Sequence, residues 1–344
     1  MPEPDKKLVR RTKKDKLRKR FPPKPEFVER MIDLIGDEDA KEFFEISYFS
    51  TPDGIRCNTL KIQPEELKKR LEKKGWKLRQ PFKDNPEVFV LKEHLIPGEL
   101  GKSIEHLMGY FYVQELSSML PMIALQPKAG EFYLDLCASP GSKTTQAAAM
   151  MENKGSIIAN DNSLGRLRIL NSNLERCGVM NQIVTKKDGV QLCKKFGEKT
   201  HVKFDKILVD APCSGEGTLR KSPKTFLMWN LKVIENLSKL QKKLASESLK
   251  LLKVGGEMVY STCTLGPEED EEVLDFLIKN FDIEIEEISL PLKTRPGITE
   301  WKGRKYSDEV KKAHRLYPQD NNTDGFFLAK IRKKSDKCLL EDRR

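Results

Sequence analysis

From about Leu134 onward the chain alternates short apolar runs with longer amphipathic segments. The apolar runs are FYLDL, SIIAND, NQIVTK, FDKILVD and EMVYSTC, and each is typical of a buried strand. Helical spacing is expected between them over Ser142–Met151, Leu164–Cys177 and Asn230–Leu252. Because parallel strands covered on both faces read as continuous apolar runs, the pattern predicts a doubly wound, Rossmann-like α/β sheet. GFFLAKI (325–331) is expected to be a closing strand.

The first hundred residues follow a different pattern. Residues 26–45 are expected to be helical, and IRCNTLKI (55–62) alternates as a strand does. PEELKKRLEKKGWKL places leucines at helical spacing, with Gly75 as a stop and an extended run from Trp76. VFVLK (88–92) is another expected strand. These segments predict a small α+β unit ahead of the α/β domain.

The chain thus divides into four predicted segments. They are a basic tail (1–25), an N-terminal α+β domain (26–105), the α/β domain (106–333) and a polar, mobile C-terminal tail (334–344) that contains Cys338. In the basic tail, KKLVRRTKKDKLRKR carries many like charges that repel one another, so we expect disorder. Such a tail suits contact with phosphates, and it equally suits a solvated tail or a trafficking signal.

Charge favours a polyanionic partner. The chain has 63 Lys and Arg against 52 Asp and Glu, a formal net charge of +11. Abundant Lys and Glu are also typical of proteins from warm-growing cells, so charge alone leaves a nucleic-acid partner open.

The cysteines argue against a disulfide scaffold and a metal site. The seven cysteines are scattered and form no CxxC pair with metal-ligand spacing. The N-terminus is charged, and no apolar stretch has the length of a membrane span. We therefore expect a protein with free thiols and no metal in the cytoplasm, or in the nucleus or nucleolus of a eukaryote.

Acidic residues end four successive predicted strands: Asp135, Asp161, Asp188 and Asp210. Any one alone fits a loop acid that caps a helix. Together they predict a ligand site at the carboxyl ends of the strands, because unpaired buried carboxylates are costly. Asp161 has the spacing of an acid that binds ribose hydroxyls. The absence of GxxxxGK[ST] and of GxGxxG disfavours a P-loop NTPase and a dehydrogenase.

Two cysteines end adjacent predicted strands. Cys213 lies in DAPCSGEG after the fourth strand, and Cys263 lies in STCT after the fifth. Both thiols are therefore expected to open onto one crevice.

DLCASPGSKT, DAPCSGEG and STCT, in this order, resemble the NOL1/NOP2/Sun family of RNA cytosine-5 methyltransferases. GYFYVQELSSMLP, IRCNTLK and HRLYPQDNNTDGFFLAKI are similar to other parts of that family, so the resemblance runs from about residue 50 to residue 331. One departure lies in the cofactor loop, commonly CAAPGGKT, where Ser139 and Ser142 stand for Ala and Gly. Both are small, so cofactor binding is expected to survive.

The resemblance implies a reaction and its residues. S-adenosylmethionine is the implied cofactor, and Cys263 is the implied nucleophile that adds to carbon 6 of cytosine. Cys213 is implied in product release, Asp210 in hydrogen bonding to the ring, and Lys143 in the active site. The implied cofactor-binding residues are Cys137, Ala138, Ser139, Pro140, Gly141, Ser142, Lys143, Asp161, Arg166, Asp188 and Asp210.

Within that set the loop is implied to hold the methionine part, Asp161 the ribose and Asp188 the adenine. Arg166 is either a contact to cofactor or RNA or an ordinary helix-surface residue. Trp229 is a candidate for base stacking or for helix packing, and His314 is a candidate RNA contact.

The implied partner is RNA, with transfer RNA first and ribosomal RNA next, bound by a monomer whose N-terminal domain contacts RNA. DNA cytosine-5 methylation is a weaker alternative, because those enzymes use the Pro-Cys thiol as nucleophile and leave STCT without a purpose. A non-catalytic RNA-binding or assembly factor is another alternative, although both cysteines and all the acids are present.

Overall fold

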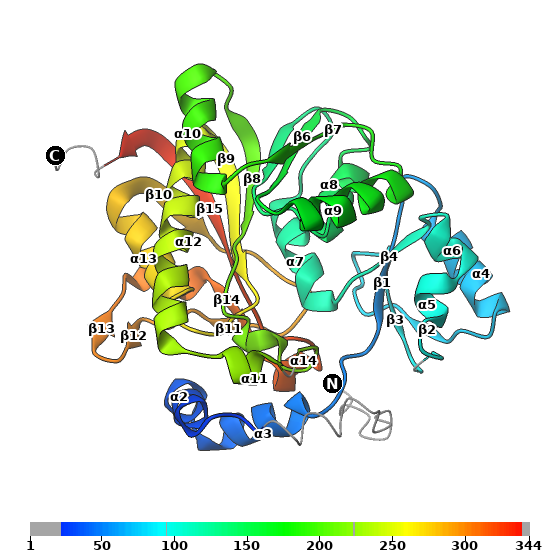
Figure 1. Cartoon of the computed structure of the whole chain (residues 1–344), viewed down its shortest axis with the longest axis horizontal. Helices are drawn as coiled ribbons and strands as arrows, with labels where there is room; N and C mark the ends of the chain where they lie inside the picture. The colour runs from blue at the N-terminus through cyan, green and yellow to red at the C-terminus, as the bar shows by residue number, and fades with distance from the viewer. Residues whose placement is uncertain (1–21, 94, 223, 339–344) are drawn as a thin grey trace.

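The computed structural model describes residues 22–93, 95–222 and 224–338. At its centre is a mixed sheet of nine strands in the order β11-β14-β15-β9-β8-β5-β6-β7, with β10 also paired to β15 (Figure 1). The strands of this sheet are β5 (Phe132–Asp135), β6 (Ser156–Asp161), β7 (Gln182–Lys186), β8 (Phe204–Asp210), β9 (Leu252–Thr262), β10 (Phe281–Glu286), β11 (Arg295–Pro296), β14 (His314–Leu316) and β15 (Phe326–Cys338).

Five of these strands, β5 to β9, are parallel to their neighbours within this set. The chain runs outward from β5 through β6 to β7, and then places β8 and β9 on the other side of β5. This arrangement confirms the predicted Rossmann-like α/β fold. It also creates a crevice at the carboxyl end of β5, because the strands next to β5 continue in opposite directions.

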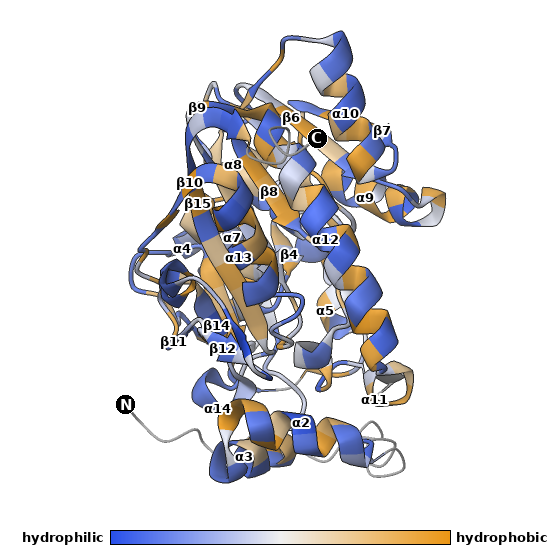
Figure 2. Ribbon diagram, turned by 90° about the vertical axis from the view of Figure 1, so that its left-hand side faces the viewer, coloured by the Kyte–Doolittle hydropathy of each residue, from blue (hydrophilic) through white to orange (hydrophobic). Residues whose placement is uncertain are grey.

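Helices cover both faces of the sheet. Figure 1 shows α7, α8 and α9 on one face and α10, α12 and α13 on the other. Each face has its own buried hydrophobic cluster, which is why the strands are apolar throughout. Figure 2 shows the central strands largely orange, whereas α12 alternates between orange and blue along its length. These helices are α7 (Leu116–Leu125), α8 (Ser142–Met150), α9 (Leu164–Cys177), α10 (Gly189–Lys199), α12 (Leu231–Leu251) and α13 (Glu271–Asn280).

A second, four-stranded antiparallel sheet forms the N-terminal α+β unit, in the order β2-β3-β1-β4. Its elements are β1 (Gly54–Cys57), α4 (Pro64–Lys73), β2 (Leu78–Arg79), β3 (Val88–Leu91), α5 (Glu99–Lys102), α6 (Ile104–Leu107) and β4 (Phe111–Val113). Two predicted bounds were wrong. The unit extends past residue 105 because β4 pairs with β1. The first strand ends at Cys57, because the Asn58 side chain accepts from the amide of Leu60 and starts a turn.

The predicted helix over 26–45 is two helices, α2 (Pro25–Ile35) and α3 (Asp37–Ser47). They are separated by Gly36, whose φ of +83° belongs to the region that favours glycine. Phe27 and Phe43 are buried against Phe226 and Leu265 of the α/β domain. The pair therefore packs on the α/β domain, and its buried residues form a cluster separate from that of the four-stranded sheet.

The C-terminal strand is also longer than GFFLAKI. β15 continues to Cys338, which pairs with Phe281 of β10, so residues 334–338 are part of the sheet and not a mobile tail. The remaining described elements are α11 (Lys224–Met228), the hairpin of β12 (Glu300–Trp301) and β13 (Arg304–Lys305), and α14 (Pro318–Asn321). Most of the predicted basic tail and the last six residues lie outside the described residues. No described helix is both long and apolar enough to cross a membrane.

Candidate active site

Strands β8 and β9 bring the two predicted cysteines together. The strands are parallel, with Asp210 in register with Ser261, so the residues that follow them leave the sheet side by side. The Sγ atoms of Cys213 and Cys263 are 3.2 Å apart, and both side chains are half-buried. The backbone amide of Gly217 donates to the Cys263 carbonyl at 3.0 Å, which connects the two loops. The expectation that both thiols share one crevice is met by this geometry.

Cys213 is a weakly acidic thiol. The hydrogen bond with Cys263, together with burial, raises the pKa of Cys213 far above the ordinary thiol value. Cys213 therefore remains a neutral thiol at physiological pH. A neutral Cys213 can donate its S–H hydrogen to the sulfur of Cys263.

Lys143 and Asp210 form an ion pair beside the thiols. The Lys143 Nζ atom is 2.8 Å from Asp210 Oδ2 and donates to Ser118 Oγ at 3.0 Å. The other carboxylate oxygen, Oδ1, accepts from Ser261 Oγ at 2.7 Å. Lys143 also lies 5.7 Å from the centre of the Phe326 ring on β15. These contacts fix the carboxylate in one orientation, with lone pairs left for a further donor.

A cavity of about 290 Å³ extends from the cysteines along the carboxyl ends of β5 to β8. From the predicted set it is lined by Cys137, Ser139, Asp161, Arg166, Asp188, Asp210, Cys213 and Cys263. Ala138, Pro140, Gly141, Ser142 and Lys143 do not line it. The β5–α8 loop (residues 136–141) therefore supplies Leu136 and the predicted Cys137 and Ser139 to the cavity wall, while its other members shape the turn behind that wall.

That turn depends on Gly141, which has a φ of +102°. A Cβ atom there would lie 3.0 Å from Leu170 Cδ1 of α9, so α9 packs directly on this loop. Helix α8 begins at Ser142, as predicted for the serine that departs from the family pattern.

The acidic residues that line the cavity differ in their burial and in their hydrogen-bond partners. Asp161 is 3% exposed; its Oδ1 accepts from the Ser163 amide at 2.9 Å, and its Oδ2 is 3.3 Å from the Arg166 guanidinium. Asp188 is exposed and caps α10 by accepting from the Gln191 amide at 3.0 Å. Asp188 is therefore a helix cap, although its side chain also borders the cavity.

Asp135, the fourth acid, does not line the cavity. It is 1% exposed, its Oδ2 accepts from Thr144 Oγ1 at 2.7 Å, and its Oδ1 has no partner among the described residues. Burial raises the pKa of Asp135 to about 7. The carboxyl group is therefore largely protonated in slightly acidic solution when the protein is folded.

We expect the contribution of Asp135 to the free energy of unfolding to fall as the pH rises from about 4 to about 7. In this range the Asp135 carboxyl group is ionised in the unfolded chain but still largely protonated in the folded protein. The loss from this group is at most about 4 kcal/mol. Urea denaturation across that range should show a smaller decline for Asp135→Asn than for the wild type. Asp188→Asn, an exposed change, is the matched control. Equal declines in Asp135→Asn and wild type would contradict a protonated Asp135.

Sequence reasoning missed the residues that hold the Cys213 loop. Glu269 accepts from the amide of Ser214 at 3.0 Å, and Gln241 Nε2 donates to the carbonyl of Pro212 at 2.9 Å. Gln241 also donates to Glu269, so the residues on both sides of Cys213 are tied together. Glu269 belongs to the run PEEDEE after STCT, which looks like an exposed acidic segment but is buried.

The other predicted positions have simpler surroundings. Trp229 packs in the cluster under α2 and donates to Glu216, so helix packing accounts for it. Nδ1 of His314 lies 2.9 Å from Thr294 Oγ1. Cys57, Cys177 and Cys193 are buried.

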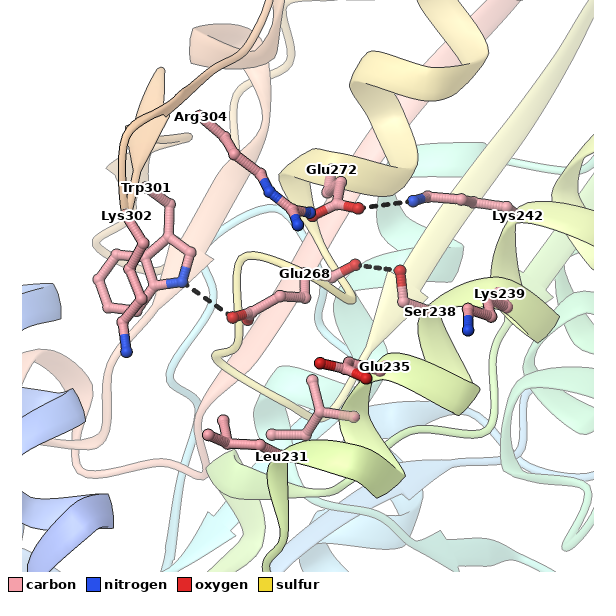
Figure 3. Close-up of a pocket in the computed structure, with 11 residues that line it drawn as sticks. Leu231, Glu235, Ser238, Lys239, Lys242, Glu268, Glu272, Trp301, Lys302 and Arg304 are labelled. Atoms are coloured by element: carbon pink, nitrogen blue, oxygen red, sulfur yellow. Dashed lines mark hydrogen bonds and ion pairs between the residues drawn. The ribbon is translucent and has the colours of Figure 1, made fainter.

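A second hollow, of about 540 Å³, lies between α12, the start of α13 and the β12–β13 hairpin (Figure 3). Within it Trp301 donates to Glu268, and Lys242 and Arg304 both form ion pairs with Glu272. None of its lining residues is a cysteine or belongs to the acids at the strand ends. Among the described residues there is also no cluster of His, Cys, Asp and Glu that could hold a metal ion.

Comparisons with known proteins agree with this arrangement. Residues 122–332 match the family model described as 16S rRNA methyltransferase RsmB/F, and residues 23–116 match that of the N-terminal domain of 16S rRNA methyltransferase RsmF. A tRNA (cytosine(49)-C(5))-methyltransferase of Pyrococcus abyssi is 46% identical over 86% of this chain and 93% of its own length.

Ribosomal RNA small subunit methyltransferase F of Shewanella piezotolerans is 41% identical over 84% of this chain, which spans only 60% of that protein. Among solved structures, a methyltransferase homolog of Pyrococcus horikoshii has a TM-score of 0.80 and 39% identity, covering 93% of this chain and 98% of that one. NSun6 from Pyrococcus horikoshii, solved with SFG, has a TM-score of 0.78 and 28% identity, covering 91% of this chain and 98% of that one.

Together, the fold and these relatives define an S-adenosylmethionine-dependent RNA methyltransferase. The chain belongs to the NOL1/NOP2/Sun family of RNA cytosine-5 methyltransferases, as its motifs predict.

Proposed function

We propose that this protein methylates carbon 5 of a cytosine in transfer RNA through a covalent bond between Cys263 and carbon 6 of the base. The observation that carries the proposal is the pair of thiols 3.2 Å apart at the ends of β8 and β9, beside the Lys143–Asp210 ion pair. Transfer RNA is favoured because the relative named for a tRNA position is matched over 93% of its length, whereas the rRNA methyltransferase of Shewanella continues well beyond the matched part.

The chemistry requires a nucleophile. Carbon 5 of cytosine is a poor nucleophile, and addition of a thiolate to carbon 6 makes it enamine-like. Cys263 adds to carbon 6, and carbon 5 then bonds to the methyl group while the bond from that methyl group to the sulfonium sulfur breaks. Transfer of the carbon-5 proton to a base, with re-formation of the C5–C6 double bond, breaks the bond between carbon 6 and Cys263 and releases the thiolate. S-adenosylmethionine supplies the electrophilic methyl group when bound. Cys213, held as a neutral thiol, acts in this last release step.

Asp210 and Lys143 act on the ring. Addition at carbon 6 increases electron density at the ring nitrogen, which is stabilised when that nitrogen is protonated and hydrogen-bonded. Asp210 accepts this hydrogen bond, since its two oxygens are already oriented by Lys143 and Ser261. Lys143 keeps the carboxylate in place and balances its charge.

The cavity fits the cofactor. S-adenosylmethionine carries a sulfonium cation, an amine and a ribose. The cavity is lined by Asp161, Asp188 and Asp210 and by the apolar side chains of Leu240 and Leu244. Buried Asp161 is suited to the ribose hydroxyls, and exposed Asp188 borders the end assigned to the adenine. The target base must be unpaired or flipped to reach the thiols.

The substrate proposal is tested with unmodified tRNA transcripts and with 16S ribosomal RNA, free and in small subunits. Incubation with methyl-labelled S-adenosylmethionine and bisulfite sequencing should find one cytosine methylated in tRNA. The preference over rRNA in kcat/KM should be about 10²-fold or more, as expected where a site reads one substrate specifically. Efficient methylation of rRNA alone would overturn the choice of substrate. Tight RNA binding without methylation of either RNA would favour a non-catalytic RNA-binding factor.

A further inference from the structure

The β5–α8 loop is held from behind by side chains that bond its carbonyl groups. Arg166 donates to the Ser139 carbonyl at 2.8 Å, and Asn173 donates to the Pro140 carbonyl at 2.9 Å. Both of these residues belong to α9 of the α/β domain. Two further donors, Arg56 and Tyr112, belong to strands β1 and β4 of the N-terminal sheet.

Arg56 connects β1 to the start of α8. Its NH1 group donates to the carbonyl of Ser142 at 2.8 Å, and its NH2 group donates to Thr145 Oγ1 at 2.8 Å. Further bonds reach the side-chain amides of Gln114 and Gln146. Among the described residues, every hydrogen-bond partner that Arg56 has is therefore a neutral oxygen.

This position is costly for a cation. Arg56 is 2% exposed, and burial lowers its pKa to about 10, so it still carries its charge at neutral pH. Among the described residues Arg56 forms no ion pair, although the charge of Glu87 favours its protonated form, and the nearby start of α8 is the positive end of a helix dipole. A positional role for this costly charge is the hydrogen bond that fixes the Ser142 carbonyl.

Tyr112 makes the second contact. Its hydroxyl donates to the Pro140 carbonyl at 3.3 Å. Its ring lies between two guanidinium groups, 5.5 Å from that of Arg56 and 5.5 Å from that of Arg176 on α9. Side chains from the N-terminal sheet and from α9 therefore both form hydrogen bonds with the same loop.

We propose that Arg56 and Tyr112 are positioning residues for S-adenosylmethionine, so that the N-terminal sheet is part of the cofactor site. Neither side chain lines the cavity. Tyr112 acts through the Pro140 carbonyl of the loop, and Arg56 acts through the first turn of α8, which directly follows the loop. The proposal rests on the cofactor site assigned above, because Cys137 and Ser139 on this loop form part of the cavity wall.

The test is isothermal titration of the RNA-free protein with S-adenosylmethionine. Tyr112→Phe removes one hydroxyl and keeps the ring, and we expect about five-fold weaker binding, the usual effect of one neutral hydrogen bond. Arg56→Lys removes the planar guanidinium group but keeps the positive charge. We expect this variant to bind S-adenosylmethionine about ten-fold more weakly, or weaker still. In steady-state kinetics KM for S-adenosylmethionine should rise, whereas KM for RNA and kcat at saturation should stay near the wild-type values.

Tyr110→Phe is the matched control, because this tyrosine precedes β4 and its ring contacts Arg70, away from the loop. Thermal unfolding checks that each variant is folded. If Arg56→Lys does not fold, the cofactor affinity of Tyr112→Phe alone tests the positioning role. Wild-type affinity in Tyr112→Phe, or loss of RNA binding with unchanged cofactor binding, would overturn the positioning role. If the wild type itself does not bind S-adenosylmethionine, the assigned cofactor site fails first, and the two failures are thereby distinguished.

Discussion

Cys213→Ala is expected to leave the protein covalently attached to its RNA, and Cys263→Ala is expected to form neither the adduct nor the methylated product. In the first variant Cys263 can still attack carbon 6, but the neutral thiol that assists release is missing. In the second no nucleophile remains, so methylation should fall by about 10³-fold or more. Denaturing gel electrophoresis after incubation with S-adenosylmethionine and small RNA separates the adduct from free protein.

Cys338→Ala is the control for this pair, because Cys338 lies at the end of β15 and outside the cavity. Its product and gel pattern should match those of the wild type. An adduct that requires Cys213 and survives loss of Cys263 would reverse the assigned roles and revive the DNA-type mechanism. Sequencing the RNA trapped by Cys213→Ala would identify the substrate directly.

Asp210→Asn is expected to lower the rate of methyl transfer by about 10² to 10³-fold, the range found when one preorganised stabilising group is removed. The amide retains the shape of the carboxylate but cannot stabilise a protonated ring nitrogen as a charge does. It also leaves Lys143 without its ion-pair partner. Single-turnover measurements with saturating RNA and S-adenosylmethionine report this step without the contribution of binding.

Asp205→Asn provides the comparison on the same strand. Asp205 is near the start of β8 and pairs with Lys253, whereas Asp210 is at the opposite end beside the thiols. We expect Asp205→Asn to leave the single-turnover rate unchanged. A near-normal rate in Asp210→Asn would show that Asp210 takes no part in the chemical step and only holds Lys143.

The sequence contains enough information for the inner strands of the central sheet, because β5, β6, β8 and β9 are largely buried and appear as apolar runs. The run NQIVTK also predicted a buried strand, but β7 lies at the edge of the sheet and is not buried. The pairing of Cys213 with Cys263 was also predictable, since adjacent parallel strands end at one edge of the sheet. The sequence pattern could not decide the role of Asp188. An acid that caps a helix and an acid that binds a cofactor both occur directly after a strand.

Contacts between distant segments were out of reach. The hydrogen bonds of Arg56 join residues 58 to 90 positions apart, and no local pattern identifies such a partner. The run PEEDEE has the composition of an exposed loop, yet buried Arg30 and Arg315 neutralise part of it from elsewhere in the chain. The extension of β15 to Cys338 was missed for the same reason, since its polar residues pair with charged residues of β10 and β9.

Strand β15 has a consequence for how the protein is made. It pairs with β9 along the edge opposite β8, with Phe327 opposite Thr262, the residue before Cys263. During synthesis on the ribosome, β9 emerges well before β15, so the edge of β9 stays open until β15 has also left the exit tunnel. Open strand edges in incomplete chains favour aggregation. The nascent polypeptide therefore depends on β15 both to avoid misassembly and to hold the Cys263 loop in position.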